Sequence, residues 1–331
     1  MKTLIKNQIL NFPEFNSGLE KIKNFLVVFA LFLGIAGCNQ YEDYINDYDH
    51  TSVYFGAQKP LRTLVARTDK DYLEFKTGVA LGGLRENKKG YSATFEVDVN
   101  VLAAVDTTKL FTLLPANCYS IESNNNTFDI PPGKFLGDCL VKINKEQFAA
   151  LPGSLTKTYA LPIKLTGTTA DLITAGKDYT VIVIKYIDEH SGSYYCKGWQ
   201  AEWNGKDTVP GTTIKYAKND LSSNKIRTLT TLSLTRFNMD GMGALSGATT
   251  ADQVNHLWIN VASGNVEVTT KTGCNAVENL MSSYNPKDNA FKDVPTFTLN
   301  YRYSKGGKNY LVNEVLILRQ DVEKELRFET W

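Results

Sequence analysis

The sequence is poor in the residues that most often build metal and catalytic sites. Its 331 residues include three histidines, each isolated, and five cysteines without C-x-x-C spacing. Zinc sites need closely spaced ligands of these two types, so we expect neither a metal nor a cofactor. A G-x-S-x-G elbow and a phosphate-loop signature are also missing. The formal net charge of +1 offers no electrostatic basis for binding nucleic acid.

No hydrophobic run is long enough to span a bilayer, which takes about 20 apolar residues. The longest uninterrupted run, Phe25–Leu33, follows Lys21 and Lys23 and precedes the small residues before Cys38. Basic, apolar and small residues in this order, ending at a cysteine, are typical of a bacterial lipoprotein signal peptide. We therefore predict that residues 1–37 are removed and that a lipid on Cys38 anchors the protein to a membrane. The alternative is a short core helix that ends at glycine.

Basic residues are missing just after the predicted cleavage site. Residues 38–50 contain four acidic residues and no lysine or arginine, which indicates an acidic linker. A stretch of this kind resembles the signal that sends Bacteroidetes lipoproteins to the outer face of the outer membrane. The sequence therefore predicts an outer-membrane, surface-exposed protein, with a periplasm-facing anchor as the alternative.

Helical periodicity is scarce in the rest of the chain, where alternation dominates. Apolar and polar residues alternate over 91–101, which predicts one half-buried strand. Residues 158–165 repeat the pattern, and Pro162 places this strand at a sheet edge because proline lacks a ladder donor. Residues 179–187 are apolar on both parities, as in a central strand.

Only short helices and tight turns are expected between the strands. Residues 145–151 have a helical pattern that ends at Pro152, and a second short helix is possible at 276–284. The Lys-Gly-Gly-Lys sequence at 305–308 lies between two β-prone segments. Two consecutive glycines accept the positive φ angles of a two-residue hairpin loop, so a hairpin is predicted there.

A polar, glycine-bearing joint beginning at Asp188 divides the strand-rich sequence. We predict an all-β chain with domains at 51–187 and 188–331. The first is expected to be an immunoglobulin-like β-sandwich. The second is expected to be a β-barrel or another β-sandwich.

An ordered series of short motifs in residues 51–187 resembles a DUF1735-type domain, found at the N-terminus of some Bacteroides surface glycosidases. The motifs are an early V-Y-F strand at 53–55, a G-G-x-R-x-N turn at 82–87, L-L-P at 113–115 and A-L-P at 160–162. Residues 188–331 resemble, mainly at their two ends, the DUF4361-type domain that commonly follows. The resemblance implies a lipoprotein of a polysaccharide-utilisation system, which binds glycan or assists an outer-membrane glycan transporter complex.

The sequence lacks what a family-18 glycosidase needs. It has no D-x-x-D-x-D-x-E strand end and no long alternation of strand and helix for a (β/α)₈ barrel. We therefore expect a binding protein rather than an enzyme, with glycoside hydrolysis as a less favoured function. A structural or adhesive surface lipoprotein without a sugar site is the main alternative.

Exposed aromatic rings are the usual means of binding a sugar, because pyranose C–H faces stack on them. Trp199 and Trp203 share one parity of a predicted strand close to the joint between domains, and Tyr284 lies in a polar loop. These three are our candidate glycan-binding residues. The alternative is that the tryptophans belong to a core, as aromatic residues at strand spacing commonly do.

With Cys38 lipidated, four cysteines remain and allow three sets of disulfide pairings, of which we consider the pair Cys118–Cys139. Cys118 and Cys139 flank a segment that reads as a strand, a polar turn and a strand. A bridge would close a loop of about 20 residues and contribute roughly 3 kcal/mol. Buried free thiols are the alternative.

Overall fold

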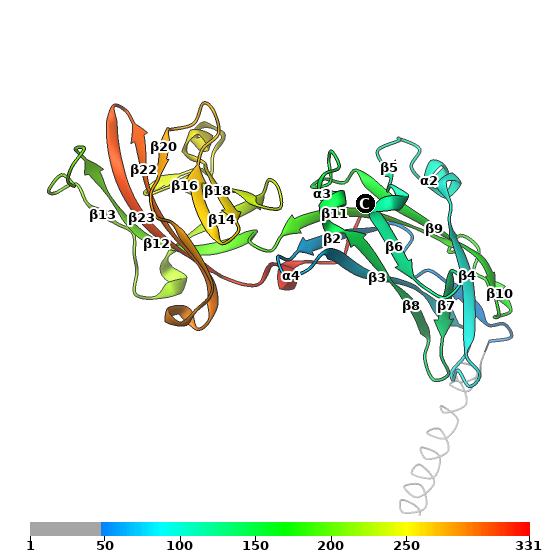
Figure 1. The fold of residues 1–331 in the computed structure, drawn as a ribbon. Helices are drawn as coiled ribbons and strands as arrows, with labels where there is room; N and C mark the ends of the chain where they lie inside the picture. The colour runs from blue at the N-terminus through cyan, green and yellow to red at the C-terminus, as the bar shows by residue number, and fades with distance from the viewer. Residues whose placement is uncertain (1–47) are drawn as a thin grey trace, which may run out of the picture.

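The computed structural model describes residues 48–331, which fold into two β-rich lobes joined end to end (Figure 1). The predicted signal peptide, Cys38 and most of the acidic linker lie outside these residues. Within the described part of the chain, no helix is both long and apolar enough to cross a membrane.

The first lobe consists of two facing sheets. One has the strand order β10-β1-β3-β8-β6, and the other β24-β2-β11-β9-β4-β7, in which β24 is Glu329–Thr330 from the end of the chain; β5 also pairs with β9. The strands up to the joint are β1 Ser52–Tyr54, β2 Pro60–Ala66, β3 Tyr72–Gly82, β4 Tyr91–Val97, β5 Thr112–Leu113, β6 Tyr119–Glu122, β7 Thr127–Ile130, β8 Leu136–Asn144, β9 Tyr159–Thr168, β10 Leu172–Ile173 and β11 Tyr179–Asp188. The short helices within residues 48–331 are α2 Val99–Val105, α3 Lys145–Ala149, α4 Val322–Glu325 and the 3-10 turns η2 Ala116–Cys118, η3 Leu221–Ser223, η4 Thr250–Asn255 and η5 Asn289–Phe291.

Alternating side chains from both sheets fill one core. Leu73, Phe75 and Val79 of β3 point inward and meet Ile182 and Ile184 of β11 in the same apolar cluster. Because each strand contributes every second residue to this cluster, the two sheets pack face to face. The predicted β-sandwich is therefore confirmed for this lobe.

The central position predicted for β11 is confirmed, since it pairs with β2 and β9. The edge position predicted for the strand containing Pro162 is wrong, because β9 lies between β11 and β4. The carbonyl of Pro162 accepts from the N–H of Asp98, just beyond the last residue of β4. A residue's N–H and C=O point to the same side of a strand, so the missing donor faces the place where β4 ends. A central strand tolerates proline there.

The strand predicted at 91–101 stops at Val97, and α2 begins at Val99. Asp98 is the N-cap of α2, and its carboxylate accepts from the backbone N–H of Asn100 at 2.8 Å. The cap provides a hydrogen-bond acceptor for the N–H of Asn100, which in a continued strand would have had to bond to a neighbouring strand. Val101 continues the apolar alternation, yet it packs on the outer side of the sheet. The helix predicted near residue 145 is confirmed as α3.

The second lobe is a single curled sheet with the strand order β19-β18-β15-β14-β12-β23-β22-β20, while β13 pairs with β12 and β21 with β22. The end strands meet, because the N–H of Val268 in β19 donates to Asn279 Oδ1 in β20 at 3.0 Å. The sheet is thus a nearly closed barrel. Its strands are β12 Gly192–Trp203, β13 Ile214–Lys215, β14 Lys225–Thr231, β15 Arg236–Met239, β18 Leu257–Ala262, β19 Asn265–Thr269, β20 Val277–Asn279, β21 Ser283–Asp288, β22 Val294–Lys305 and β23 Lys308–Leu318; a separate small ribbon pairs β16 Gly241–Met242 with β17 Leu245–Ser246.

The predicted glycine hairpin is confirmed between β22 and β23. Gly306 and Gly307 adopt φ angles of 60° and 75°, the left-handed values that a type I′ turn requires. The short helix considered at 276–284 is replaced by β20 and the start of β21. Pairing with the long strand β22 outweighs the weak helical pattern there, as tertiary contacts commonly do.

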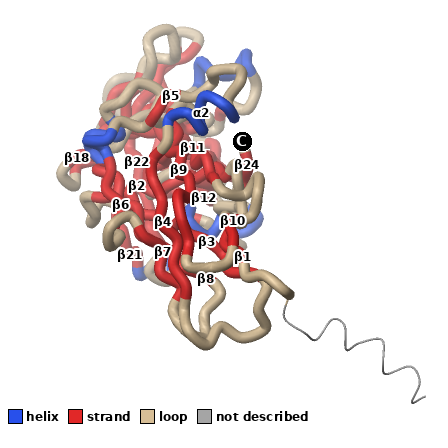
Figure 2. Tube along the Cα trace, turned by 90° about the vertical axis from the view of Figure 1, so that its right-hand side faces the viewer, coloured by secondary structure: helices blue, strands red, loops and turns tan. Residues whose placement is uncertain are grey.

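The last residues of the chain leave the barrel and return to the sandwich. Residues 329–330 form β24 and pair with β2, and the C-terminus lies near α2 (Figure 2). The Trp331 indole N–H donates to the Val181 carbonyl at 2.7 Å, and its ring contacts Phe111. The range 188–331 therefore contributes residues to both lobes.

The disulfide considered between Cys118 and Cys139 is not formed. Both are buried free thiols. The β6–β8 register pairs Tyr119, next to Cys118, with Ile143, which is about 14 Å along β8 from Cys139. A disulfide needs Cα atoms within about 7 Å. Burial raises the pKa of the Cys139 thiol to about 11.

Candidate functional site

The outer face of β12 carries the two candidate tryptophans. Tyr194, Cys196 and Gln200 of this strand point into the barrel and are buried. Trp199 and Trp203 have the opposite parity and are partly exposed. The shared face predicted from their spacing is therefore present in the fold, and it is the solvent side of the sheet.

Trp199 is the centre of a row of side chains that crosses four strands. It pairs with Lys215 of β13 on one side and with Asn313 of β23 on the other. Asn313 in turn pairs with Asn300 of β22, and its amide donates to Asn300 Oδ1 at 2.7 Å. Directly paired residues project from the same face of a sheet. We call Lys215, Trp199, Asn313 and Asn300 the Trp199 row.

The ring of Trp199 is available to a ligand. Among residues 48–331, its side chain makes no hydrogen bond, ring contact or cation–π contact. Its indole N–H is not buried, so it reaches solvent. A flat apolar face with a free donor, flanked by amides and an ammonium group, matches the C–H faces and hydroxyl groups of a pyranose.

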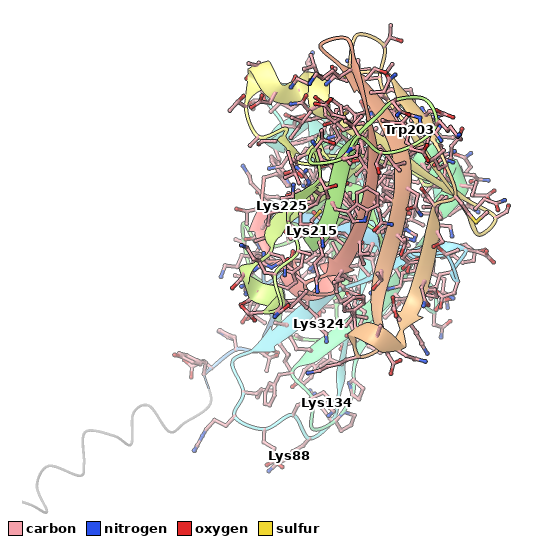
Figure 3. The ribbon with its side chains drawn as sticks, turned by 90° about the vertical axis from the view of Figure 1, so that its left-hand side faces the viewer. Lys88, Lys134, Trp203, Lys215, Lys225 and Lys324 are labelled. Atoms are coloured by element: carbon pink, nitrogen blue, oxygen red, sulfur yellow. The ribbon has the colours of Figure 1, made fainter. Side chains whose placement is uncertain are left out.

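Trp203 is less available than Trp199. The guanidinium of Arg302 lies 4.6 Å from its ring centroid, and Arg302 is itself held by Glu278 at 3.1 Å. One face of the indole is therefore covered by a cation–π contact. Trp203 is the last residue of β12, the strand that starts at the joint between the lobes, and Figure 3 labels it in a view from the side of the second lobe.

Tyr284 is not part of this surface. It pairs with Phe297 of β22, and the partner of Phe297 in β23 pairs in turn with Cys196. Tyr284 therefore points to the inside of the barrel, as Cys196 does. Its ring contacts His190 and Phe297, each at a centroid distance of 4.6 Å, and burial raises its pKa to about 12. The polar loop predicted around Tyr284 is therefore wrong, because Tyr284 lies in β21 and packs, half-buried, against the barrel core.

The tryptophans also do not lie at the joint between the lobes. Strand β12 starts at the joint with Gly192, and Trp199 is seven residues farther on. At about 3.3 Å per residue this places it roughly 23 Å away. The joint instead holds His190, whose Nδ1 is 2.6 Å from Asp188 Oδ1. Proximity to a domain joint therefore does not support a ligand-binding role for the two tryptophans.

A buried polar cluster, unforeseen from the sequence, fills the barrel interior behind β12. Glu314 of β23 is fully buried, and its two oxygens accept from the hydroxyl groups of Tyr216 and Tyr301 at 2.9 and 2.8 Å. Arg227 Nη2 lies 3.9 Å from the same carboxylate. Burial, with the Glu314 charge, raises the pKa of both phenols well above the usual range.

The arginine of this cluster fixes a loop across the barrel. Arg227 donates to the carbonyls of Asp240, Gly243 and Leu245 at 2.8 to 2.9 Å, and these residues belong to the β16–β17 ribbon and its flank. The cluster is thus a structural network with no solvent-exposed carboxylate. Within residues 48–331, no group of three or more His, Cys, Asp or Glu side chains is placed to hold a metal ion.

Comparison with known proteins supports the fold. A family model of an N-terminal domain matches residues 48–172, which is most of the sandwich. No curated protein matches the sequence. A solved structure from Bacteroides ovatus, described as of unknown function, is 19% identical over 83% of this chain and 95% of its own, with a TM-score of 0.64.

Two other solved structures resemble the chain more distantly. A Bacteroides ovatus multidomain protein including DUF1735 is 11% identical over 85% of this chain and 100% of its own, with a TM-score of 0.40. An auxiliary nutrient binding protein from Bacteroides thetaiotaomicron is 14% identical over 80% and 92%, with a TM-score of 0.38. Residues 48–172 thus match an N-terminal domain family, and 83% of the chain shares its fold with a Bacteroides ovatus protein of unknown function.

Proposed function

We propose that this protein is a lipid-anchored outer-membrane protein that binds glycan on the outer face of its second lobe. The observation that carries the proposal is the Trp199 row. Its indole has a free ring face and a free N–H, in register with two amide side chains that already position one another. Such a surface stacks a sugar ring and bonds its hydroxyl groups without enclosing it.

The proposed activity is binding without cleavage. A general acid must reach the glycosidic oxygen within hydrogen-bond distance. The carboxylate directly behind the Trp199 row is Glu314, which is 0% exposed and held by two phenols. The role that fits is glycan capture at the cell surface, with delivery to a transporter complex in the outer membrane.

Trp199→Ala should weaken glycan binding about fivefold, because loss of one stacking contact is worth about 1 kcal/mol. Affinity electrophoresis in gels containing xyloglucan, galactomannan or mixed-linkage β-glucan measures this directly. Trp203→Ala should have a smaller effect, since Arg302 covers one face of that ring. The melting temperature should change little in both variants, because both rings lie outside the core.

Trp258→Ala is the matched control. Trp258 is also a partly exposed outward tryptophan of this lobe, but it lies on β18, away from the row. It should leave retention in the gel unchanged. Equal weakening by Trp199→Ala and Trp258→Ala, or a large loss of melting temperature in Trp199→Ala, would exclude the Trp199 row as the site.

The anchor is tested separately from the sugar site. Cys38→Ala should release the protein from the membrane fraction, because the acyl chains on Cys38 supply the proposed membrane affinity. Protease added to intact cells should digest the wild type if it faces the medium. Protection in intact cells with digestion after lysis would contradict surface exposure and leave the lipid anchor standing.

A further inference from the structure

A charged side chain occupies a core-facing position in β2. Leu64 and Ala66 belong to the sandwich core, and Arg62 has the same parity. Arg62 pairs with Ile184 of β11, whose side chain is also in that core. Paired residues project from one face, so the Arg62 side chain enters the space between the two sheets at their open side.

Arg62 has no partner among residues 48–331. Its Nε is buried without a hydrogen bond, and neither terminal nitrogen bonds to any described group. Those two nitrogens are not buried, so the fork of the guanidinium is open to solvent. By contrast, Arg67 is paired with Glu189, Asp321 and Glu323. Burial lowers the pKa of Arg62, in keeping with a cation that nothing compensates.

The open fork faces a pocket of about 370 Å³ between the sheets. Its walls are largely apolar and include Phe55, Val79 and Ile182. Phe328 and Leu136, which are 65% and 70% exposed, flank it. The lining residues contain two cations and no acid. The volume is in the range of small-molecule sites, and the charge is unbalanced in favour of an anion.

We propose that this pocket, which we name the Arg62 pocket, binds the carboxylate of an acidic sugar. A guanidinium fork donates two parallel hydrogen bonds to a planar carboxylate. The second cation, Lys76, is already bonded to Asp138 at 3.1 Å, so Arg62 is left as the one free positive charge, which pairs with one carboxylate of the ligand. The ring of Phe328 offers a face for the pyranose. The carboxylate follows from Arg62 alone, whereas the choice of a sugar rests on the proposed glycan-binding function.

A purely structural role for Arg62 makes a different prediction. An inward-pointing charge near a sheet edge discourages edge-to-edge pairing, and β2 is covered on its outer side only by the two residues of β24. In that role the pocket would need no ligand. The two roles are separated by ligand binding and by the effect of replacing the charge.

Isothermal titration calorimetry of the purified protein with trigalacturonate tests the proposal. Its methyl ester is the neutral control ligand, and acetate is the control for a bare carboxylate. Arg62→Gln should weaken trigalacturonate binding tenfold or more, by roughly the strength of a charge-assisted hydrogen bond. Lys88→Gln, which removes one positive charge from an exposed position, should bind as the wild type does.

A second variant blocks the pocket without touching the charge. Gly56 lines the pocket, and a β-carbon added there meets no heavy atom within 4 Å. Gly56→Leu should therefore fold normally and abolish trigalacturonate binding by occupying the space. Arg62→Leu should also abolish binding while keeping or raising the melting temperature, because it removes an uncompensated charge from a partly buried position.

The proposal would be supported if the wild type binds trigalacturonate selectively and both Gly56→Leu and Arg62→Leu abolish that binding. Absence of binding to the wild type, equal binding of the methyl ester or acetate, or full binding by Arg62→Gln would overturn it. Retention of neutral polysaccharides by the Trp199 row should be unchanged in Arg62→Gln. If the wild type binds trigalacturonate but retains no neutral glycan, the proposed function at Trp199 would be overturned. The proposal for the Arg62 pocket would still stand.

Discussion

Glu314→Ala should lower the free energy of unfolding of the second lobe by about 3–5 kcal/mol. The substitution leaves Arg227 in the barrel without its countercharge and leaves the hydroxyl groups of Tyr216 and Tyr301 without their acceptor. Removing one partner from a buried ionic network costs more than the network contributes, because the remaining groups stay desolvated. Urea denaturation followed by tryptophan fluorescence measures the effect.

Two further variants identify the cause of that loss. Glu278→Ala removes an exposed carboxylate paired with Arg302 and should cost no more than about 1 kcal/mol, as surface ion pairs do. In a double-mutant cycle, Arg227→Met should cost much less in the Glu314→Leu background than in the wild type. Additive effects of the two substitutions would show that Arg227 and Glu314 do not stabilise one another.

Deletion of residues 326–331 should destabilise the first lobe by about 2–3 kcal/mol. This segment supplies β24 and places Trp331 over the outer apolar cluster that contains Leu61 and Val181. The deletion removes the burial of a large aromatic ring and one hydrogen bond, and these two losses account for this magnitude. Thermal unfolding monitored by near-UV circular dichroism, with the second lobe intact, is the measurement.

Trp331→Phe separates the ring from its hydrogen bond. It keeps the contact with Phe111 and removes the donor to the Val181 carbonyl, so it should cost about 1 kcal/mol. Glu329→Ala, at an exposed position of β24, should have little effect. An unchanged melting temperature after the deletion would mean that the sandwich is stable without the returning chain. The fragment 51–187 would then be an autonomous domain.

Much of the strand content could be predicted because alternation is a local property. Period-two apolar patterns identified β4, the central β11 was recognised by apolar residues on both faces, and the Gly306–Gly307 loop located its hairpin. Errors occurred where a single polar contact outweighed the pattern. Asp98 ended a strand that the alternation would have extended, and the end of β4 allowed Pro162 in a central strand.

The site residues divide in the same way. Parity correctly placed Trp199 and Trp203 on one face, but the sequence did not say which face is outside. Tyr284 was assigned to a polar loop on composition, and its packing against His190 depends on a residue far away in the chain. The inward charges of Arg62 and Glu314 carried a signal that was available. Each is a charged residue among apolar residues at every second position of its strand. That exception could have been noted from the sequence pattern alone.

By itself, the sequence determined that the chain is β-rich, where most of its strands run and which residues share a face of each strand. These features depend on backbone geometry and on neighbours two positions apart. Only the tertiary structure decided that the C-terminal residues return to the first lobe, that Glu314 meets Arg227, and that Arg62 faces a pocket without a countercharge. The reason is physical: burial and charge compensation depend on side chains that the chain brings together from many residues apart, and no local pattern encodes that pairing.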